Sequence, residues 1–384
     1  MNRAPRILLG VTADISLTLM RGFPEYLRDH GWDVHVVSNP GPALTALSAV
    51  PGISTHALAM ERRPSPLQDL RSLSSWCRVL HSVRPDVLSV GTPKAGLLGG
   101  IAGFLMRVPR RVYLLRGLRL ETSSGIRRRV FWVLERISIG VAHEVVSVSD
   151  SLRARVVGLG LVHSTKILVL GHGSSNGVDI AAFSASAFAP GEIATLADSL
   201  HIAPAIPVIG FVGRLSADKG LKVLAEARSI LIQRGVDHQL LIVGGIDEGE
   251  DESLLNTMGL EGREIIATGQ VHDTRPYFKL IDILCLPTYR EGFPNVVLES
   301  AASGIPAVTT DATGAIDSVI AGETGLIVDV GSATELADAL QTLIFDPIRR
   351  AEMGAAAHRY VSENFARADV WERTNSYYIE NLHV

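Results

Sequence analysis

The sequence has little cysteine and no long apolar run free of charge, and both absences narrow the class of protein. Cys77 and Cys285 are the only two cysteines among 384 residues, and each stands in an apolar stretch. A disulfide framework or a cysteine-based metal cluster is therefore excluded, and a reducing compartment is indicated. The uncharged apolar run at residues 95–106 stops at Arg107. It is well short of the roughly 20 apolar residues that a transmembrane helix needs.

A secretion signal is also missing from the start of the sequence. MNRAPRILLGV reaches an apolar strand at once and shows neither the long apolar core nor the small-residue cleavage site of a signal peptide. We therefore expect a cytoplasmic protein. An apolar content of 47 % and a length of 384 residues favour two globular domains.

Charge is divided unevenly along the chain. Residues 1–180 hold 22 Lys and Arg against 12 Asp and Glu, whereas the remainder holds 14 against 28. The first half is expected to meet an anionic partner, either a membrane surface or a pyrophosphate-bearing lipid, although a solvated basic face is the alternative. Arginines stand among aromatic residues, as at a membrane interface: Arg107, Arg110, Arg111, Arg127, Arg128 and Arg129. Nucleic acid is disfavoured because no nucleic-acid-binding motif accompanies the charge.

Short β-branched or leucine-rich runs alternate with segments of helical period along the whole chain. This alternation predicts an α/β fold in which parallel sheets are covered by helices on both faces. The expected strands are 6–10, 34–38, 87–90, 112–115, 145–148 and 167–170 in the first half, and 208–212, 240–243, 265–268, 283–286, 307–310 and 326–328 in the second.

A stretch rich in Ala, Ser and Pro separates the two halves. It predicts an N-terminal domain over 1–180, a linker over 181–206 and a C-terminal domain over 207–365. After residue 347 a long helical pattern runs to the C-terminus, and its last part, 366–384, carries Trp371, Tyr377 and Tyr378. We expect this aromatic helix to pack back on the first domain. Two such domains would present a ligand cleft beyond the carboxyl ends of their strands.

The strongest local pattern is EGFPNVVLE, which follows the strand at 283–286 and leads into a helix. Glu291 and Glu299 are eight residues apart, and each carboxylate suits a vicinal diol: the ribose for Glu299, the sugar for Glu291. Pro294 suits the first helical turn. The backbone amides there are expected to lie at the positive end of the helix dipole, which attracts phosphate. The segment between the two acids comprises Gly292, Phe293, Pro294, Asn295 and Val296.

A second pattern, GRLSADKG, places two cations after the strand at 208–212. Arg214 and Lys219 flank the turn into the next helix. There they are expected to stabilise the negative charge that builds on a diphosphate when its bond to a sugar breaks, without a metal ion. No Asp-x-Asp motif follows a strand. The acidic run 247–252 lacks that spacing and is interpreted as a solvated loop.

These patterns, together with GIPAVTTDATGAIDSVIAGETGLIV, resemble the retaining glycosyltransferases of family 4 over nearly the whole chain. The resemblance implies the GT-B architecture, two Rossmann-like doubly wound domains with an interdomain cleft. It implies that Arg214 and Lys219 bind the donor diphosphate, that Glu299 binds ribose and that Glu291 contacts the transferred sugar. Gly269 and Val271 match a segment that holds the nucleobase through its main chain. The nucleotide-sugar is then a substrate, and neither a metal nor another cofactor is expected.

The first half resembles, more locally, family members that extend undecaprenyl-diphosphate-linked glycans for capsule, exopolysaccharide or glycan assembly. The motifs are GTPKAGLLGG, RGLRLET and GHGSSNGVD. Acceptor contacts are accordingly expected from Lys94, Arg116, Arg119, Glu121 and His172, although interdomain salt bridges would account for the charged ones. The first loop, TADISL, departs from the Gly-Gly loop of many relatives, so Asp14 and Ser16 are expected to contact sugar or acceptor instead.

The sequence thus predicts a retaining, metal-independent transferase. It would move a hexose or N-acetylhexosamine from a nucleotide-sugar, UDP-linked by expectation, to a lipid-diphosphate-linked sugar at the cytoplasmic face of the inner membrane. Two alternatives stay open. One is a nucleotide-sugar epimerase of the same architecture, although no clear acid/base set is present. The other is a non-catalytic partner in a polysaccharide-assembly complex, against which the four charged donor residues argue.

Overall fold

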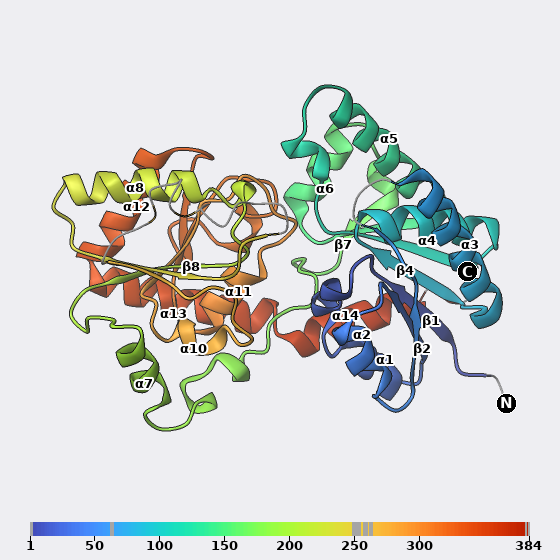
Figure 1. Cartoon of the computed structure of the whole chain (residues 1–384), viewed down its shortest axis with the longest axis horizontal. Helices are drawn as coiled ribbons and strands as arrows, with labels where there is room; N and C mark the ends of the chain where they lie inside the picture. The colour runs from blue at the N-terminus through green and yellow to red at the C-terminus, as the bar shows by residue number, and fades with distance from the viewer. Residues whose placement is uncertain are drawn as a thin grey trace. The chain divides into compact units, whose positions relative to one another are not determined.

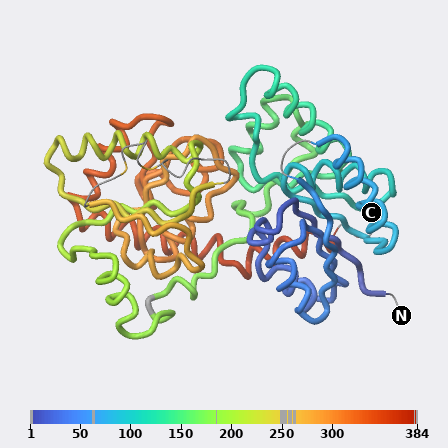
Figure 2. Tube along the Cα trace, viewed as in Figure 1, coloured from blue at the N-terminus to red at the C-terminus, as the bar shows by residue number. Residues whose placement is uncertain are grey.

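The computed structural model describes residues 3–61, 65–247, 255, 260, 264–380 and 382, and it divides into two compact units (Figures 1 and 2). The first unit comprises Met1–Asn176 and Ala368–Val384, and the second comprises Gly177–Arg367. The stretch 181–206, predicted as a linker, belongs to the second unit and contains one helix, α7 (Glu192–Ser199). The last helix belongs to the first unit except for its initial residue.

The first unit is built on a seven-stranded parallel sheet in the order β3-β2-β1-β4-β5-β6-β7. Every residue of β4 is buried, because helices cover both faces of the sheet. Figure 1 shows α1, α2 and α14 on one face, and α3 and α4 on the other. The elements are β1 (Arg6–Gly10), α1 (Phe23–Asp29), β2 (Asp33–Ser38), α2 (Pro42–Ser48), β3 (Ile53–Ala57), α3 (Pro66–Val83), β4 (Val87–Gly91), α4 (Pro93–Leu105), β5 (Arg110–Leu115), α5 (Gly125–Val141), β6 (Glu144–Ser147), α6 (Asp150–Gly158), β7 (Ile167–Val169) and α14 (Arg367–Glu380), with 3₁₀ turns η1 (Asp14–Met20), η2 (Arg119–Thr122) and η3 (Ser164–Lys166).

The second unit holds a six-stranded parallel sheet in the order β10-β9-β8-β11-β12-β13. Helices α8 and α12 pack together on one face, and α11 packs with α13 on the other (Figure 1). Its elements are α7, β8 (Val208–Val212), α8 (Leu221–Gln233), β9 (Gln239–Val243), β10 (Ile265–Ala267), α10 (Arg275–Phe278), β11 (Ile283–Leu286), α11 (Asn295–Ala302), β12 (Ala307–Thr310), β13 (Gly325–Val328), α12 (Ala333–Phe345) and α13 (Pro347–Asn364), with 3₁₀ turns η4 (Ala181–Phe183), η5 (Ala185–Ala187), η6 (Ala217–Lys219) and η7 (Ile316–Ser318).

The terminal helical pattern is two helices rather than one. It breaks between α13 and α14, where Phe365 is fully buried and Ala366 forms a bridge with Val178. The Phe365 carbonyl accepts from the Val178 amide, and the Val178 carbonyl accepts from the Arg367 amide. This short pairing diverts the backbone from helical bonding and sets a new direction for α14.

Helix α14 packs its aromatic side chains on the first sheet. Trp32 Nε1 donates to Asn375 Oδ1 (2.8 Å), and the hydroxyls of Ser89 and Tyr378 are 2.7 Å apart. Arg110, predicted to be part of a surface cluster, is buried instead. Its Nη1 donates to the carbonyls of Tyr377 and Tyr378, because the last turn of a helix leaves carbonyls without helical partners. Among the described residues, no helix is both long and apolar enough to cross a bilayer.

Candidate functional site

Most of the predicted donor residues follow β8 and β11, two neighbouring strands at the centre of the second sheet. The connection from β8 leads to β9 on one side, while β11 lies on the other side. Ligands of open α/β sheets bind at such a switch point, beyond the carboxyl ends of the strands. The order of strands therefore places the loops that carry Arg214, Lys219 and Glu291 at a ligand-binding edge of the sheet.

The loop after β8 is tied to the loop after β9. Gly244 has φ +148° and approaches Gly213 so closely that an added Cβ would lie 1.8 Å from the Gly213 carbonyl oxygen. Beyond this contact, the Leu215 amide donates to the Gly245 carbonyl (2.9 Å). The pairing brings the exposed Arg214 to Asp247, with which it forms an ion pair. The remainder of the acidic run, 248–252, lies outside the described residues.

Lys219 ends η6 and contacts Glu291 directly. Its Nζ lies 2.5 Å from Glu291 Oε1, and the two side chains are only 17 % and 13 % exposed. The next residue, Gly220, has φ +74°, and an added Cβ would lie 1.8 Å from the carbonyl oxygen of Pro287 at the end of β11. Glycine is therefore required at position 220 for the two loops to meet. The structure thus brings together one predicted cation and one predicted acid.

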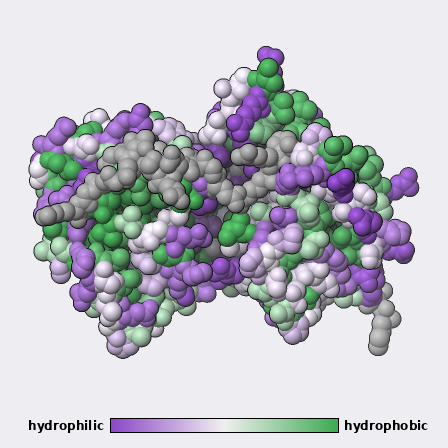
Figure 3. Space-filling view, in the orientation of Figure 1, coloured by the Kyte–Doolittle hydropathy of each residue, from purple (hydrophilic) through white to green (hydrophobic). Residues whose placement is uncertain are grey.

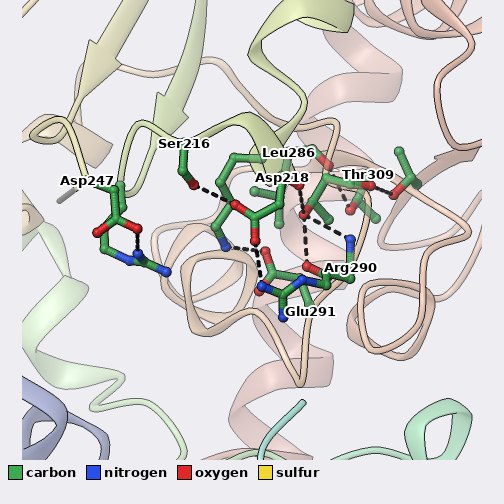
Figure 4. Close-up of polar contacts among 11 residues, drawn as sticks. Ser216, Asp218, Asp247, Leu286, Arg290, Glu291 and Thr309 are labelled. Carbon is green, nitrogen blue, oxygen red and sulfur yellow. Dashed lines mark hydrogen bonds and ion pairs between the residues drawn. The ribbon is translucent and has the colours of Figure 1, made fainter. Parts of the chain in front are cut away.

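Asp218 links the same two loops through both its side chain and its backbone (Figure 4). Its carboxylate accepts from Ser216 Oγ (2.6 Å) and from Arg290 Nη2 (2.9 Å). Its carbonyl accepts from the Tyr289 amide (2.9 Å). Burial by itself would raise the pKa of Asp218, but the bond from Ser216 and the charges of Arg290, Lys219 and Arg214 lower that pKa below its ordinary value. Asp218 is therefore an anion that holds the residues beside Lys219 and Glu291 in place.

The loop from Glu291 to the start of α11 is held by backbone contacts. The Glu291 amide donates to the Thr313 carbonyl (2.8 Å), and Gly314, with φ +77°, lies against the backbone of Gly292. Pro294, predicted in the first helical turn, is instead the N-cap with an extended ψ of 100°, and the helix starts at Asn295. Phe293 is buried, and its ring packs 5.3 Å from the ring of Phe365.

The remaining predicted donor residues lie around this edge of the sheet. Val296 is the second residue of α11 and Glu299 the fifth, and both are partly exposed. Gly269, with φ +68°, follows β10 and is exposed, and Val271 stands two residues further on. The Gly269 carbonyl accepts from the Gly244 amide (3.1 Å). The loops after β8, β9 and β10 are therefore joined in series.

This geometry prepares two cations for an anionic ligand. Arg214 and Lys219 already face carboxylates, and a diphosphate that displaced Asp247 and Glu291 would take over the same positive charges. The displaced Glu291 carboxylate would then be released toward hydroxyl groups. Within the described part of the chain, no three His, Cys, Asp or Glu side chains are grouped as metal ligands.

The predicted acceptor residues of the first unit are dispersed over several loops and differ in what they contact. Asp14 caps α2: its carboxylate accepts from the amides of Ala43 (3.0 Å) and Leu44 (2.7 Å). Ser16 lies in the same 3₁₀ turn, and its amide donates to the Ala13 carbonyl. Lys94, at the start of α4, pairs with Asp69 at 2.7 Å.

Four further acceptor candidates lie after β5 and β7. Glu121 in η2 pairs with Arg155 (3.2 Å), and Arg119 in the same turn is exposed. His172, after β7, is also exposed. Arg116, directly after β5, has buried Nε and Nη1 atoms without hydrogen-bond partners. Of the predicted acceptor residues, Arg116 is the one with buried donor atoms that lack a partner in the described structure.

Sequence reasoning missed Asp218, Arg290 and Asp247, which hold the donor residues. Asp218 and Arg290 stand directly beside Lys219 and Glu291 in the two quoted motifs. Their adjacency to the predicted ligands was a signal that the sequence offered. The ion pair between Asp218 and Arg290 could not be predicted, because nothing in the sequence states that these two loops meet.

The two parallel-sheet units give this protein the GT-B fold, the fold of the glycosyltransferases described next. A glycosyltransferase from Rickettsia africae aligns with a TM-score of 0.81 at 19 % identity, over 100 % of both chains. Alr3699/HepE of Anabaena, solved in complex with UDP, aligns with a TM-score of 0.77 at 22 % identity, over 98 % of this chain and 100 % of that one. At these identities the likeness establishes the fold.

The family follows from sequence comparison. Residues 20–173 match the model of the glycosyl transferase 4-like domain, and residues 206–346 match that of the glycosyl transferases group 1. CapM of Staphylococcus aureus, a capsular polysaccharide biosynthesis glycosyltransferase, is 34 % identical over 373 residues, 96 % of this chain and 95 % of CapM. The chain therefore belongs to this family of glycosyltransferases.

Proposed function

We propose that this protein is a retaining glycosyltransferase of cell-surface polysaccharide biosynthesis. It moves a hexose or N-acetylhexosamine from a UDP-sugar to a sugar on a lipid diphosphate at the cytoplasmic face of the membrane. The observation that carries the proposal is the contact between Lys219 and Glu291 at the switch point of the second sheet, with Arg214 on the adjoining loop. The names of CapM and of the UDP complex of HepE support the pathway and the nucleotide.

In the proposed reaction the donor diphosphate displaces the two carboxylates from Arg214 and Lys219. The bond between the sugar's anomeric carbon and the phosphate oxygen breaks, and the two cations stabilise the charge on the leaving diphosphate without a metal ion. The acceptor oxygen bonds to the same face of that carbon, and its proton passes to the leaving phosphate. Glu291 then binds hydroxyls of the sugar, Glu299 those of the ribose, and the backbone of Gly269 and Val271 the base.

A membrane location is supported by an outward-facing apolar stripe on α5. Ile126, Val130, Val133 and Ile137 recur at helical spacing and are 81 %, 47 %, 49 % and 40 % exposed, while the buried residues of the helix are Glu135, Ser138 and Ile139. An exposed apolar stripe of this kind departs from the usual amphipathic arrangement, in which apolar residues face the core.

Basic residues flank the stripe and complement an anionic lipid surface. Arg127, Arg128 and Arg129 form the first turns of α5, and exposed Phe104 and Leu105 end the neighbouring α4. Figure 3 shows hydrophobic and hydrophilic surface side by side over this part of the first unit. Arg110 and Arg111 do not contribute: Arg110 is buried, and Arg111 donates to the carbonyls of Val141 and Val108. We assign this surface, residues 104–107 and 126–137, to a membrane rich in anionic lipid.

The test is to incubate the protein with UDP-hexoses and UDP-N-acetylhexosamines, with and without an undecaprenyl-diphosphate-linked sugar. We expect UDP release and a lengthened lipid product only when the acceptor is present, with the anomeric configuration of the donor retained by NMR. Lys219→Ala should abolish transfer, whereas Lys222→Ala, an exposed lysine one turn further on, should not. An isomerised nucleotide-sugar formed without acceptor would instead identify an epimerase. Undiminished transfer after combined loss of Arg214, Lys219, Glu291 and Glu299 would refute the assigned site.

A further inference from the structure

The loop after β9 places an acidic side chain directly against a donor-site cation. Strands β8 and β9 pair along their whole length, and beyond them the two loops pair once more, at the bridge between Leu215 and Ile246. The Leu215 carbonyl accepts from the Asp247 amide (3.0 Å). The backbone therefore fixes Asp247 beside Arg214, with which its carboxylate forms an ion pair.

This ion pair stands apart from the contacts that hold the donor loops together. In Figure 4 the Asp247 carboxylate lies to one side of Asp218 and Arg290. The Asp218 carboxylate is bonded to Arg290 across two loops and so supports both of them. The loop of Asp247 is joined to the loop of Arg214 through the backbone. The Asp247 carboxylate thus meets Arg214 from a position that backbone bonds already hold.

The two ion pairs of the donor site differ in exposure. The side chains of Lys219 and Glu291 are 17 % and 13 % exposed. Those of Arg214 and Asp247 are 61 % and 24 % exposed. Exposed ion pairs contribute little free energy, because water competes for both charges. The pair of Arg214 and Asp247 is therefore the one that an incoming anion opens at small cost.

A carboxylate and a phosphoryl group compete for a guanidinium, because both accept its paired N–H donors. A ligand therefore gains at Arg214 only the difference between its own contact and the ion pair that it displaces. This loss is the same for every ligand that brings a phosphoryl group to Arg214. Free phosphate anions have no further contacts to offset it, whereas a nucleotide adds those of its base and ribose.

We propose that Asp247 is a built-in competitor for the donor diphosphate. Its carboxylate occupies the Arg214 guanidinium in the free protein, lowers the affinity of the site for phosphate-bearing ligands, and returns to Arg214 when the nucleotide leaves. The inference rests on the proposed function, which assigns the diphosphate to Arg214 and Lys219. It makes Asp247 a residue that sets the affinity of the donor site without binding the ligand itself.

Calorimetric titration of the wild-type chain and of Asp247→Asn with UDP, inorganic pyrophosphate and uridine tests the competition. Asparagine keeps the size of the side chain and removes its charge. We expect the variant to bind UDP and pyrophosphate about two- to fivefold more tightly, the worth of an exposed ion pair. Uridine, which has no phosphate, should bind both proteins equally. Asp247→Ala should reproduce the gain, because it also removes the charge.

A supporting role for Asp247 predicts the opposite sign. If the carboxylate served to hold Arg214 in its binding position, both variants would bind UDP more weakly, and that result would overturn the proposal. Unchanged affinity for UDP and pyrophosphate would overturn it as well, and so would a gain that uridine shares. The matched control is Asp338→Asn, which removes the charge from an exposed pair with Arg234 at the far end of α8 and should bind all three ligands as wild type does.

The two proposals fail separately in these experiments. If wild type transfers sugar from a UDP-sugar but Asp247→Asn binds UDP no more tightly, only the competition is wrong. If the variant binds UDP and pyrophosphate more tightly but no nucleotide-sugar is consumed with any acceptor, the competition stands and the proposed transferase function fails.

Discussion

The pair formed by Asp218 and Arg290 gives the sharpest test of how the donor site is built. The Asp218 carboxylate and Arg290 Nη2 are 2.9 Å apart, and their side chains are 23 % and 27 % exposed. Fully exposed pairs contribute roughly 0.2–1 kcal/mol, whereas hydrogen bonds to buried charged groups contribute about 1.5–3 kcal/mol. The partial exposure places the coupling energy at about 1–2 kcal/mol.

A double-mutant cycle with Asp218→Asn and Arg290→Gln, followed by urea unfolding, measures this coupling. We expect each single variant to lose stability and the double variant to lose less than their sum. A matched cycle on the surface pair Arg234 and Asp338, which are 2.6 Å apart and 35 % and 57 % exposed, should give about 0.5 kcal/mol or less. Equal coupling energies in the two cycles would show that the Asp218–Arg290 pair stabilises the protein no more than an exposed ion pair does.

The same variants should affect sugar transfer more than their stability loss explains. Asp218 holds the loops of Lys219 and Glu291, and a misplacement of about 1 Å at a reacting centre can lower a rate by roughly 100-fold. We therefore expect kcat/KM to fall at least about tenfold in Asp218→Asn at a temperature where the variant is fully folded. Unchanged kcat/KM in both single variants would refute the positioning role.

Two further predictions concern α5. Burial raises the pKa of Glu135 to about 7, against the effect of the hydrogen bond from Tyr113 and the charge of Arg119. Because its folded pKa is raised, Glu135 favours folding below its unfolded pKa of about 4.5 and loses that contribution as pH rises through about 7. Glu135→Gln should hence stabilise the protein by up to about 3 kcal/mol more at pH 8 than at pH 5 in urea unfolding, and a pH-independent effect would contradict this. Separately, changing Arg127, Arg128 and Arg129 to Gln should weaken salt-sensitive binding to phosphatidylserine vesicles; unchanged binding, or a dimer that buries α5, would refute the membrane assignment.

Much of the sheet framework could be predicted from sequence because fully buried parallel strands are continuous apolar runs. The strands at 6–10, 208–212, 283–286 and 307–310 have the predicted bounds. β3 was not predicted. Its sequence, ISTHA, is short and mostly polar, since it lies at the edge of the sheet with one neighbouring strand and is only partly buried. The apolar edge strands β7 (ILV) and β10 (IIA) were predicted, so β3 was missed because its own residues are polar.

The candidate site was also predictable only in part. Motif spacing was enough to place Arg214, Lys219 and Glu291 on loops that follow strands, whereas the adjacency of those strands is known from the structure. The partners of these residues depend on loop paths set by close backbone contacts such as that of Gly220 with Pro287, and sequence spacing does not encode such contacts. The burial of Arg110 was missed for a related reason. The sequence does not show whether an arginine is buried against a partner or exposed at the surface.

The most direct test of the account is calorimetric titration of UDP into wild type and the variants Lys219→Ala, Glu299→Ala, Glu291→Ala and Lys222→Ala. The account predicts that Lys219→Ala and Glu299→Ala lose about tenfold or more in affinity, since each removes a contact to the nucleotide. Glu291→Ala should bind UDP as well as wild type or better, because the carboxylate that competes for Lys219 is gone, yet it should transfer sugar slowly. Lys222→Ala should match wild type. Equal affinity in Lys219→Ala and wild type, or equal losses in Glu291→Ala and Glu299→Ala, would contradict the donor site.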